Sequence, residues 1–292
     1  MKILILCSGG DAPGMNMFIN KMYKAFKKQV SFALAGFTGL VNGQIYPLAD
    51  VVYKGFEQEA GAVIKSSRCP EFKECEVFEK GLENAKKFDC VVILGGNGSE
   101  KGAKQLYENG VNTIFVPATI DNDVDENFYT IGFSTAVKEC VYTIKNTMPS
   151  IKTFGQSCLF EVMGRENDAI CKAAAQEVGA DYVVCNKKSL DYEEIKNVIL
   201  KKYIKGQSCC ILVRENIAKI ENIAKKLNEL LGIELVKFQV VGRTQRGGAP
   251  TKEELSMATK FANETIKCVK TKVFGVRVLT DENKNIVVKE FK

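Results

Sequence analysis

The sequence contains no histidine among its 292 residues. This absence excludes Ser–His and Cys–His nucleophile pairs, histidine-ligated metals, and imidazole as an acid or base. Carboxylates must therefore perform any proton transfer that the protein catalyses.

The sequence also has no apolar run long enough to cross a membrane. Its content of 46% hydrophobic and 26% charged residues is typical of a globular protein and not of a disordered one. The opening apolar run, residues 3–7, is too short for a signal peptide and leads into a glycine-containing loop without a cleavage site of small residues. We therefore expect a cytoplasmic protein with no membrane partner.

None of the eleven cysteines has the C-x-x-C spacing that is typical of zinc sites. Several of them lie inside apolar runs of strand length, namely Cys7, Cys90, Cys158, Cys209 and Cys210. This pattern favours buried, reduced thiols over disulfides or a metal site.

The net charge of +6, from 41 basic and 35 acidic residues, comes largely from scattered lysine pairs. Such pairs at expected helix ends are typical of solvated surfaces, and no alternation of basic and aromatic residues accompanies them. We therefore expect acidic small molecules as partners, and no nucleic acid.

Apolar runs of strand length alternate with amphipathic helical segments along the whole chain, which predicts an α/β protein. The expected strands are residues 2–7, 31–35, 90–94, 113–116, 157–160, 181–185, 208–213, 234–241 and 273–278. The run 90–94 is almost continuously apolar, as in parallel sheets covered on both faces. A chain of this length can form two lobes.

Two expected strands lead into glycine-rich loops that precede helices, residues 8–14 and 95–99. Such loops and helix starts offer backbone N–H groups to phosphates. One glycine loop is weak evidence, because strand-to-helix turns often need glycine for steric reasons. Two such loops and a third segment at strand ends would converge on one crevice.

The third segment, residues 117–123, follows the apolar run 113–116 and carries Asp121 and Asp123. In an extended backbone these two carboxylates point the same way, and the intervening Asn122 points elsewhere. One could take a proton while the other binds a metal. Asp and Asn also occupy turns routinely, so this segment alone does not decide between a site and a turn.

The chain contains six short motifs, Ser-Gly-Gly-Asp-Ala-Pro-Gly-Met-Asn (8–16), Gly-Gly-Asn-Gly-Ser (95–99), Thr-Ile-Asp-Asn-Asp (119–123), Tyr-Thr-Ile-Gly-Phe (129–133), Glu-Val-Met-Gly-Arg (161–165) and Gln-Arg-Gly-Gly (245–248). In order and spacing they resemble the motifs of the bacterial-type 6-phosphofructokinases. The resemblance covers nearly the whole chain. It implies two Rossmann-like, three-layer α/β/α lobes with mostly parallel sheets: a nucleotide-binding lobe (1–132 plus 245–292) and a sugar-phosphate-binding lobe (133–244).

The resemblance further implies a glycolytic kinase that transfers the γ-phosphoryl group of ATP to the 1-hydroxyl of fructose 6-phosphate. Asp121 would be the base, with Thr119 and Arg165 as further catalytic residues. The nucleotide site would comprise Gly10, Arg68, Cys69, Gly96, Asn97, Gly98 and Ser99, and Mg²⁺ would be bound by Asn97 and Asp123. Besides Thr119 and Asp121, the substrate would contact Gln156, Met163, Gly164, Arg165, Glu215, Lys237, Arg243 and Arg246.

Four residues depart from the family pattern. Asn97 replaces a metal-associated Asp, Arg243 replaces a sugar-binding histidine, and Gln156 and Lys237 replace arginines that a neighbouring subunit supplies to the 6-phosphate. The resemblance implies a homotetramer. These departures leave two alternatives open: a non-catalytic regulatory paralogue that binds nucleotide, and a kinase of a different sugar phosphate.

The phosphoryl donor can also be predicted from the resemblance. Family members that use pyrophosphate generally carry Asp at the position of Gly98 and Lys at that of Ala118. Since both positions are small here, we expect ATP to be the donor.

Overall fold

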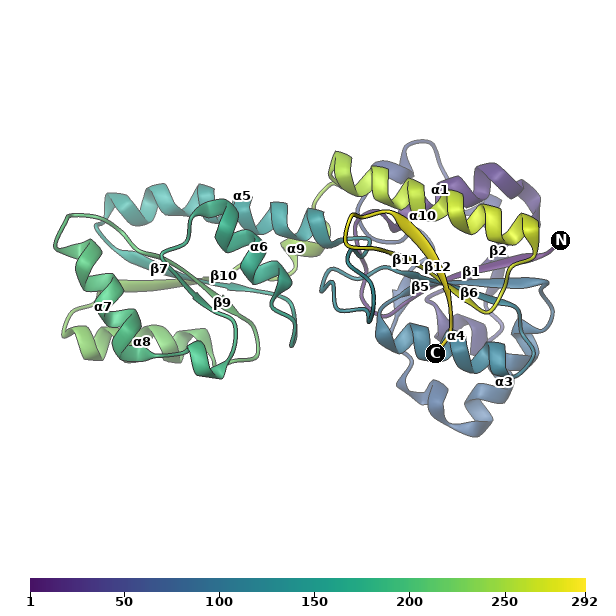
Figure 1. The fold of residues 1–292 in the computed structure, drawn as a ribbon, viewed down its shortest axis with the longest axis horizontal. Coiled ribbons are helices and arrows are strands. Elements are labelled where there is room, and N and C mark those ends of the chain that lie inside the picture. Colours follow the sequence, from purple (N-terminus) through teal and green to yellow (C-terminus); the bar gives the residue numbers. More distant parts are fainter. The chain divides into compact units, whose positions relative to one another are not determined.

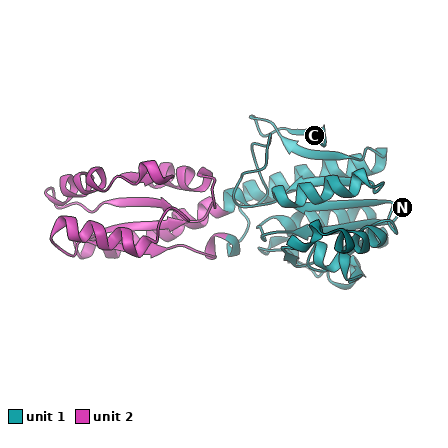
Figure 2. Cartoon of the chain, turned by 90° about the horizontal axis from the view of Figure 1, so that it is seen from below, with its two compact units in different colours: residues 1–135, 246–292 teal, residues 136–245 magenta.

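The computed structural model describes residues 1–292, which form two compact units. Unit 1 comprises residues 1–135 and 246–292, and unit 2 comprises residues 136–245 (Figure 2). No helix in either unit is both long enough and apolar enough to span a membrane.

Unit 1 is built on one sheet in the order β12-β11-β6-β5-β1-β2-β3, with β4 pairing to β1. Its strands are β1 (Ile3–Ser8), β2 (Val30–Ala33), β3 (Ile45–Pro47), β4 (Ser66–Ser67), β5 (Cys90–Gly95), β6 (Thr113–Pro117), β11 (Val276–Thr280) and β12 (Ile286–Glu290). All pairings are parallel except β2 with β3 and β11 with β12. The central strands β1 and β5 are buried throughout, because their continuous apolar runs are covered on both faces.

Helices cover both faces of this sheet (Figure 1). Helices α1 (Met15–Phe26) and α10 (Lys252–Thr271) lie on one face, and α3 (Cys75–Ala85) and α4 (Asn97–Glu108) lie on the other. The short helix α2 (Phe37–Val41) follows β2. Single 3-10 turns are η1 (Lys27–Gln29), η2 (Leu48–Asp50), η3 (Phe56–Gln58) and η4 (Pro70–Lys73).

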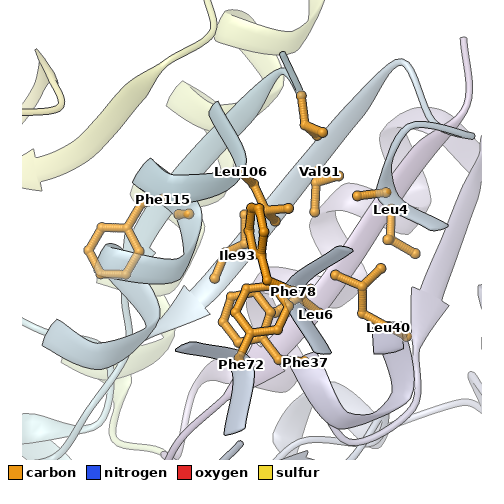
Figure 3. Packing of buried hydrophobic residues seen from close by; sticks show 14 of the residues in the cluster. Leu4, Leu6, Phe37, Leu40, Phe72, Phe78, Val91, Ile93, Leu106 and Phe115 are labelled. Carbon is orange, nitrogen blue, oxygen red and sulfur yellow. The ribbon is translucent and has the colours of Figure 1, made fainter. Parts of the chain in front are cut away.

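An aromatic cluster fills the core of unit 1 on the side of α3 and α4 (Figure 3). The rings of Phe37 and Phe72 stack with centroids 4.4 Å apart, and Phe78 meets Phe72 edge-on at 5.4 Å. Gly102 of α4 permits this packing, since a Cβ there would lie 2.7 Å from the Phe37 ring. The cluster therefore holds α4, and with it the loop from which α4 begins, close to the sheet.

Unit 2 has a fully parallel sheet in the order β10-β7-β9-β8. Its strands are β7 (Ser157–Val162), β8 (Tyr182–Val184), β9 (Cys210–Arg214) and β10 (Val236–Val240). Helices α5 (Phe133–Thr153) and α6 (Ala169–Val178) cover one face, and α7 (Tyr192–Tyr203) and α8 (Ile220–Leu231) cover the other (Figure 1). The 3-10 turn η5 (Lys187–Ser189) and the short helix α9 (Thr244–Gly247) complete the element set.

Both units are three-layer α/β/α structures with mostly parallel sheets, so the predicted fold class is confirmed. The strand set differs from the sequence prediction, because β3, β4 and the antiparallel strand β12 were not predicted. Strand β12 is mostly exposed and carries charged residues, which weakens its apolar pattern.

Candidate active site

The ends of three neighbouring strands are aligned in unit 1. Ser8 at the end of β1 pairs with Gly95 at the end of β5, and Gly95 pairs with Pro117 at the end of β6. The three loops predicted from the sequence therefore leave the sheet side by side at its carboxyl edge, where open α/β sheets bind ligands.

Ser99 connects two of these loops. Its hydroxyl donates to the Ser8 carbonyl at 3.1 Å, and its side chain is 4% exposed. A Cβ at Gly95 would lie 2.2 Å from Ser99 Oγ and 2.4 Å from the Ser8 carbonyl oxygen, so only glycine fits there. The structure thus places Ser99, which we expected to face the nucleotide, in a buried position that holds the β1 and β5 loops together.

The start of α4 is the open part of this arrangement. Gly98 is exposed, and a Cβ added to it would meet no atom within 4 Å. Gly96 is the N-cap of α4, and its carbonyl accepts from the Ser99 amide at 2.9 Å. The amides of Asn97 and Gly98 have no intrahelical acceptor and are available to an anion. Gly96 and Gly98 therefore lie where a phosphate could approach the backbone.

The segment that carries Asp121 forms a turn directly after β6. Asn122 has a φ of 51°, a left-handed conformation that Asn tolerates better than most residues. Its Oδ1 accepts from the Thr130 amide at 2.9 Å, so its side chain points away from the carboxylates on either side. The candidate site segment is therefore a turn, and the extended backbone that we assumed for Asp121 and Asp123 is wrong.

Thr119 and Asp121 are both buried at the end of β6, with 9% and 3% of their surfaces exposed. The Thr119 hydroxyl accepts from the Asp121 amide at 3.3 Å, and the Thr130 hydroxyl donates to the Thr119 carbonyl. A Cβ at Gly96 would lie 3.7 Å from Thr119 Cβ. The turn therefore places Thr119 beside the helix start that could receive a phosphate.

The side chain of Asn97 is hydrogen-bonded to the segment that carries Asp121 and Asp123. Its Nδ2 donates to the backbone carbonyl of Asp123 at 2.9 Å, and both residues are half-buried. The bond brings Asn97, whose side chain carries an amide oxygen, next to Asp123, whose side chain is a carboxylate. No group of three or more His, Cys, Asp or Glu residues that could hold a metal ion occurs in the structure.

Arg246 lies against the first glycine loop. Its Nη1 donates to the Asp11 carbonyl at 2.8 Å, and a Cβ at Gly10 would lie only 2.6 Å from the same nitrogen. Gly10 therefore makes room for Arg246, a role that the sequence did not indicate. Asp11 and Arg246 line an open cleft of about 550 Å³ together with residues 58–61.

Arg68 and Cys69 reach the same region through β4. Ser67 pairs with Ser8 at the end of β1, and the Gly9 amide donates to the Ser67 carbonyl at 2.9 Å. The exposed Arg68 therefore follows a strand that ends beside the glycine loop. Cys69 is half-buried, and burial raises the pKa of its thiol.

In unit 2, Glu215 shapes the loop that follows β7. Its Oε1 accepts from the amides of Gly164 at 3.1 Å and Arg165 at 2.8 Å. The φ values of these two residues are 140° and 51°, so the loop has a left-handed backbone that these bonds stabilise. The Arg165 side chain is exposed at the surface of unit 2, and Met163 is half-buried beside it.

Sequence reasoning missed two residues that support this loop. Gln245 is fully buried and accepts from the Met163 amide at 3.1 Å. It is the first residue of the Gln-Arg-Gly-Gly motif. Arg214 is also buried, and its guanidinium donates to the carbonyls of Cys185 and Arg165. An arginine that ends the otherwise apolar strand β9 was the only sequence signal for this role.

Gln156 and Lys237 lie at the opposite end of the unit 2 sheet. Gln156 directly precedes β7, and Lys237 is the second residue of β10, where it pairs with Glu234. Arg165 follows the other end of β7, so about 20 Å of strand separates it from Gln156. Arg243 is exposed after β10, at the same end as Arg165. Within unit 2, Gln156 and Lys237 therefore do not join the loop formed by residues 163–165.

Comparisons with known proteins agree on one family. A model described as Phosphofructokinase matches residues 2–269. The ATP-dependent 6-phosphofructokinase of Finegoldia magna is 34% identical over 299 residues, which cover 98% of this chain and 91% of that protein. The enzyme of the same name from Streptococcus sanguinis is 34% identical and covers 95% of this chain and 84% of its own length.

Solved structures show the same fold. A structure of phosphofructokinase from Saccharomyces cerevisiae aligns with a TM-score of 0.86 at 23% identity and covers 99% of this chain, which spans 44% of that longer chain. A pyrophosphate-dependent phosphofructokinase from Nitrosospira multiformis aligns with a TM-score of 0.84 at 16% identity, covering 99% of this chain and 82% of its own.

Proposed function

Because the chain belongs to the phosphofructokinase family, we propose that it transfers the γ-phosphoryl group of ATP to the 1-hydroxyl of fructose 6-phosphate, a reaction of glycolysis. The observation that carries this proposal is the alignment of Ser8, Gly95 and Pro117, which brings two glycine loops and the Asp121 turn to one sheet edge. Relatives with 31–34% identity carry the name ATP-dependent 6-phosphofructokinase. The proposed location is the cytoplasm, where glycolytic substrates occur.

Phosphoryl transfer depends mainly on positioning and charge neutralisation. In the proposed reaction, the 1-hydroxyl oxygen of the sugar attacks the γ-phosphorus of ATP, the bond to the β–γ bridging oxygen breaks, and ADP leaves. Asp121 accepts the proton of the hydroxyl, and Thr119 donates a hydrogen bond to the transferring group. The amides at the start of α4 bind the nucleotide phosphates. Arg165 neutralises charge that develops on the phosphoryl oxygens, so the mechanism needs no histidine.

The residues present fit a Mg²⁺ ion that arrives with the nucleotide. Asn97 contributes an amide oxygen and Asp123 a carboxylate, the hard oxygen donors that Mg²⁺ prefers. One or two protein carboxylates suffice for Mg²⁺, because the ion usually keeps several waters and phosphate oxygens as ligands. When bound, the ion would neutralise charge between the β- and γ-phosphates. Asn97 and Asp123 would hold it, and the bond between the Asn97 amide and the Asp123 carbonyl would orient both.

The sugar phosphate is proposed to contact Met163, Gly164, Arg165, Arg243 and Arg246. Glu215 contributes by fixing the backbone of residues 163–165. Gln156 and Lys237 lie at the other end of the unit 2 sheet, which supports the proposal that a second copy of the chain supplies them. A site completed by a second copy of the chain requires a homo-oligomer, and we propose a tetramer.

The test is a coupled assay of ADP release by the purified chain with Mg²⁺, ATP and a panel of sugar phosphates. We expect turnover with fructose 6-phosphate and the highest kcat/KM for that substrate. A higher kcat/KM with another sugar phosphate would replace the substrate assignment. ATP binding without ADP release on any sugar phosphate would instead identify a nucleotide-binding paralogue without catalysis.

A further inference from the structure

Arg277 of β11 is the largest side chain that the fold buries almost completely, with 2% of its surface exposed. Its guanidinium contacts two carboxylates, with Nη1 3.1 Å from Glu100 Oε1 and Nη2 2.7 Å from Glu126 Oε2. Its Nε donates to the Glu290 carbonyl at 3.3 Å. Each of its nitrogens therefore has a protein partner, as a buried cation requires.

The two carboxylates belong to the two segments of the proposed nucleotide–metal site. Glu100 is in the first turn of α4, directly after the residues that could receive phosphate. Glu126 follows Asp123 by three residues and has a φ of 60°, so it lies in a second tight turn. Arg277 thus joins the start of α4 to the chain segment that leaves Asp123.

Strand β11 holds this segment at a second position. The Thr280 hydroxyl accepts from the amides of Phe128 at 3.2 Å and Tyr129 at 2.8 Å, and Thr280 is fully buried. The hydrogen bond from the Asn97 amide to the Asp123 carbonyl also holds this segment, from the start of α4. Arg277 supplies the positive charge in these connections, and its planar fork can bind two carboxylates at once, which a lysine ammonium does less well.

We propose that Arg277 is a positioning residue for the metal-bound nucleotide: it sets the spacing between Asp123 and the first turn of α4 by bridging Glu126 and Glu100. This inference rests on the proposed function. It assigns a role in binding to the strand β11, which contributes no residue to the predicted site.

Removing the Arg277 side chain should have two opposing effects on metal binding. Loss of a positive charge near a Mg²⁺ site should strengthen binding of the cation, because Arg277 repels it. Loss of a bridge should weaken binding, because Asp123 and Asn97 would no longer be held at one spacing. Replacing groups that orient metal ligands commonly lowers metal affinity by about 10–100-fold. The sign of the change therefore distinguishes the two effects.

The experiment compares the native chain with Arg277→Met, Arg277→Lys and Lys292→Met. Lys292→Met is the matched control, since Lys292 pairs with the other oxygen of Glu126 and its loss removes the same charge without breaking the bridge. Arg277→Lys keeps the charge and tests the fork, and it provides a test if Arg277→Met does not fold. Mn²⁺ binding in the presence of ADP is measured by electron paramagnetic resonance, and the rate is measured against free Mg²⁺ and against the sugar phosphate.

We expect both Arg277 variants to weaken Mn²⁺ binding and to raise the half-saturating Mg²⁺ concentration by about tenfold, the lower end of that range. The KM of the sugar phosphate should stay within about twofold, and Lys292→Met should not weaken metal binding. Tighter or unchanged metal binding in the Arg277 variants would overturn the proposal, as would an equal rise in the sugar KM. If the native chain shows no turnover, the proposed function fails, while the Mn²⁺–ADP measurement still decides the role of Arg277.

Discussion

Replacing Glu254 with glutamine should remove most of the pH dependence of stability near neutrality. Glu254 of α10 is fully buried and accepts hydrogen bonds from the Gly132 amide at 2.8 Å, the Ser134 hydroxyl at 3.1 Å, and the Thr135 amide at 3.3 Å. Burial raises the pKa of this carboxyl to about 7 from its ordinary 4.5, although these hydrogen bonds oppose the rise.

The sign of the effect follows from proton uptake. Between the two pKa values the folded chain binds a proton at Glu254 that the unfolded chain has already lost. The associated stability is therefore fully present below a pH of about 4.5 and is lost as the pH rises through about 7. The rise from 4.5 to about 7 corresponds to about 3 kcal/mol, most of which falls between pH 5 and pH 8.

Because the chain has no histidine, no side chain has an ordinary pKa between pH 5 and pH 8. The Tyr129 hydroxyl lies beside Glu254, and the neighbouring residue Glu253 pairs with Lys284 at 2.6 Å. Glu126 contributes in another range. Lys292 and Arg277 lower its pKa to about 2, so its stabilising effect is present above about 4.5 and is lost as the pH falls towards 2.

The assay is urea unfolding at several pH values from 5 to 8. All curves are fitted with the same slope of unfolding free energy against urea concentration. The native chain should lose about 2–3 kcal/mol of unfolding free energy across this range. Glu254→Gln should be nearly independent of pH, and Glu253→Gln, a change at an exposed neighbour, should follow the native curve. Parallel curves for the native chain and Glu254→Gln would refute the reasoning.

Three further substitutions test the proposed site. Asp121→Asn should lower kcat by about 10²–10⁴-fold while nucleotide binding persists, as expected for loss of a general base, and a rate near that of the native chain would exclude this role. Gly10→Ala places a Cβ where Arg246 Nη1 lies at 2.6 Å, so the KM of the sugar phosphate should rise several-fold with little change in the KM of ATP. Equal changes in the two constants would argue against Arg246 as a sugar-phosphate ligand. Gly98→Asp should leave the fold intact, because no atom lies within 4 Å of the new Cβ. The added carboxylate should weaken ATP binding by charge repulsion and so raise the KM for ATP. An unchanged KM for ATP would show that Gly98 does not face the nucleotide.

The sequence alone was enough to predict the α/β architecture and the segments that meet at the edge of the unit 1 sheet. Apolar runs such as residues 90–94 bury both faces of a strand, and glycine directly after a strand marks a sharp turn into a helix. These are local signals, since each depends on neighbours within a few positions. The alignment of the strand ends then followed from parallel pairing, which the alternation of strands and helices predicts.

Only the tertiary structure determined what individual side chains do at this edge. Arg277 meets Glu100 and Glu126 across 177 and 151 positions of sequence, and Ser99 meets the Ser8 carbonyl across 91. No periodicity links such residues, so Ser99 was expected at the nucleotide and the role of Arg277 was not expected at all. The conformation of the Asp121 turn was also decided at a distance, because the bond from the Thr130 amide to Asn122 fixes a left-handed backbone that two carboxylates in sequence do not specify.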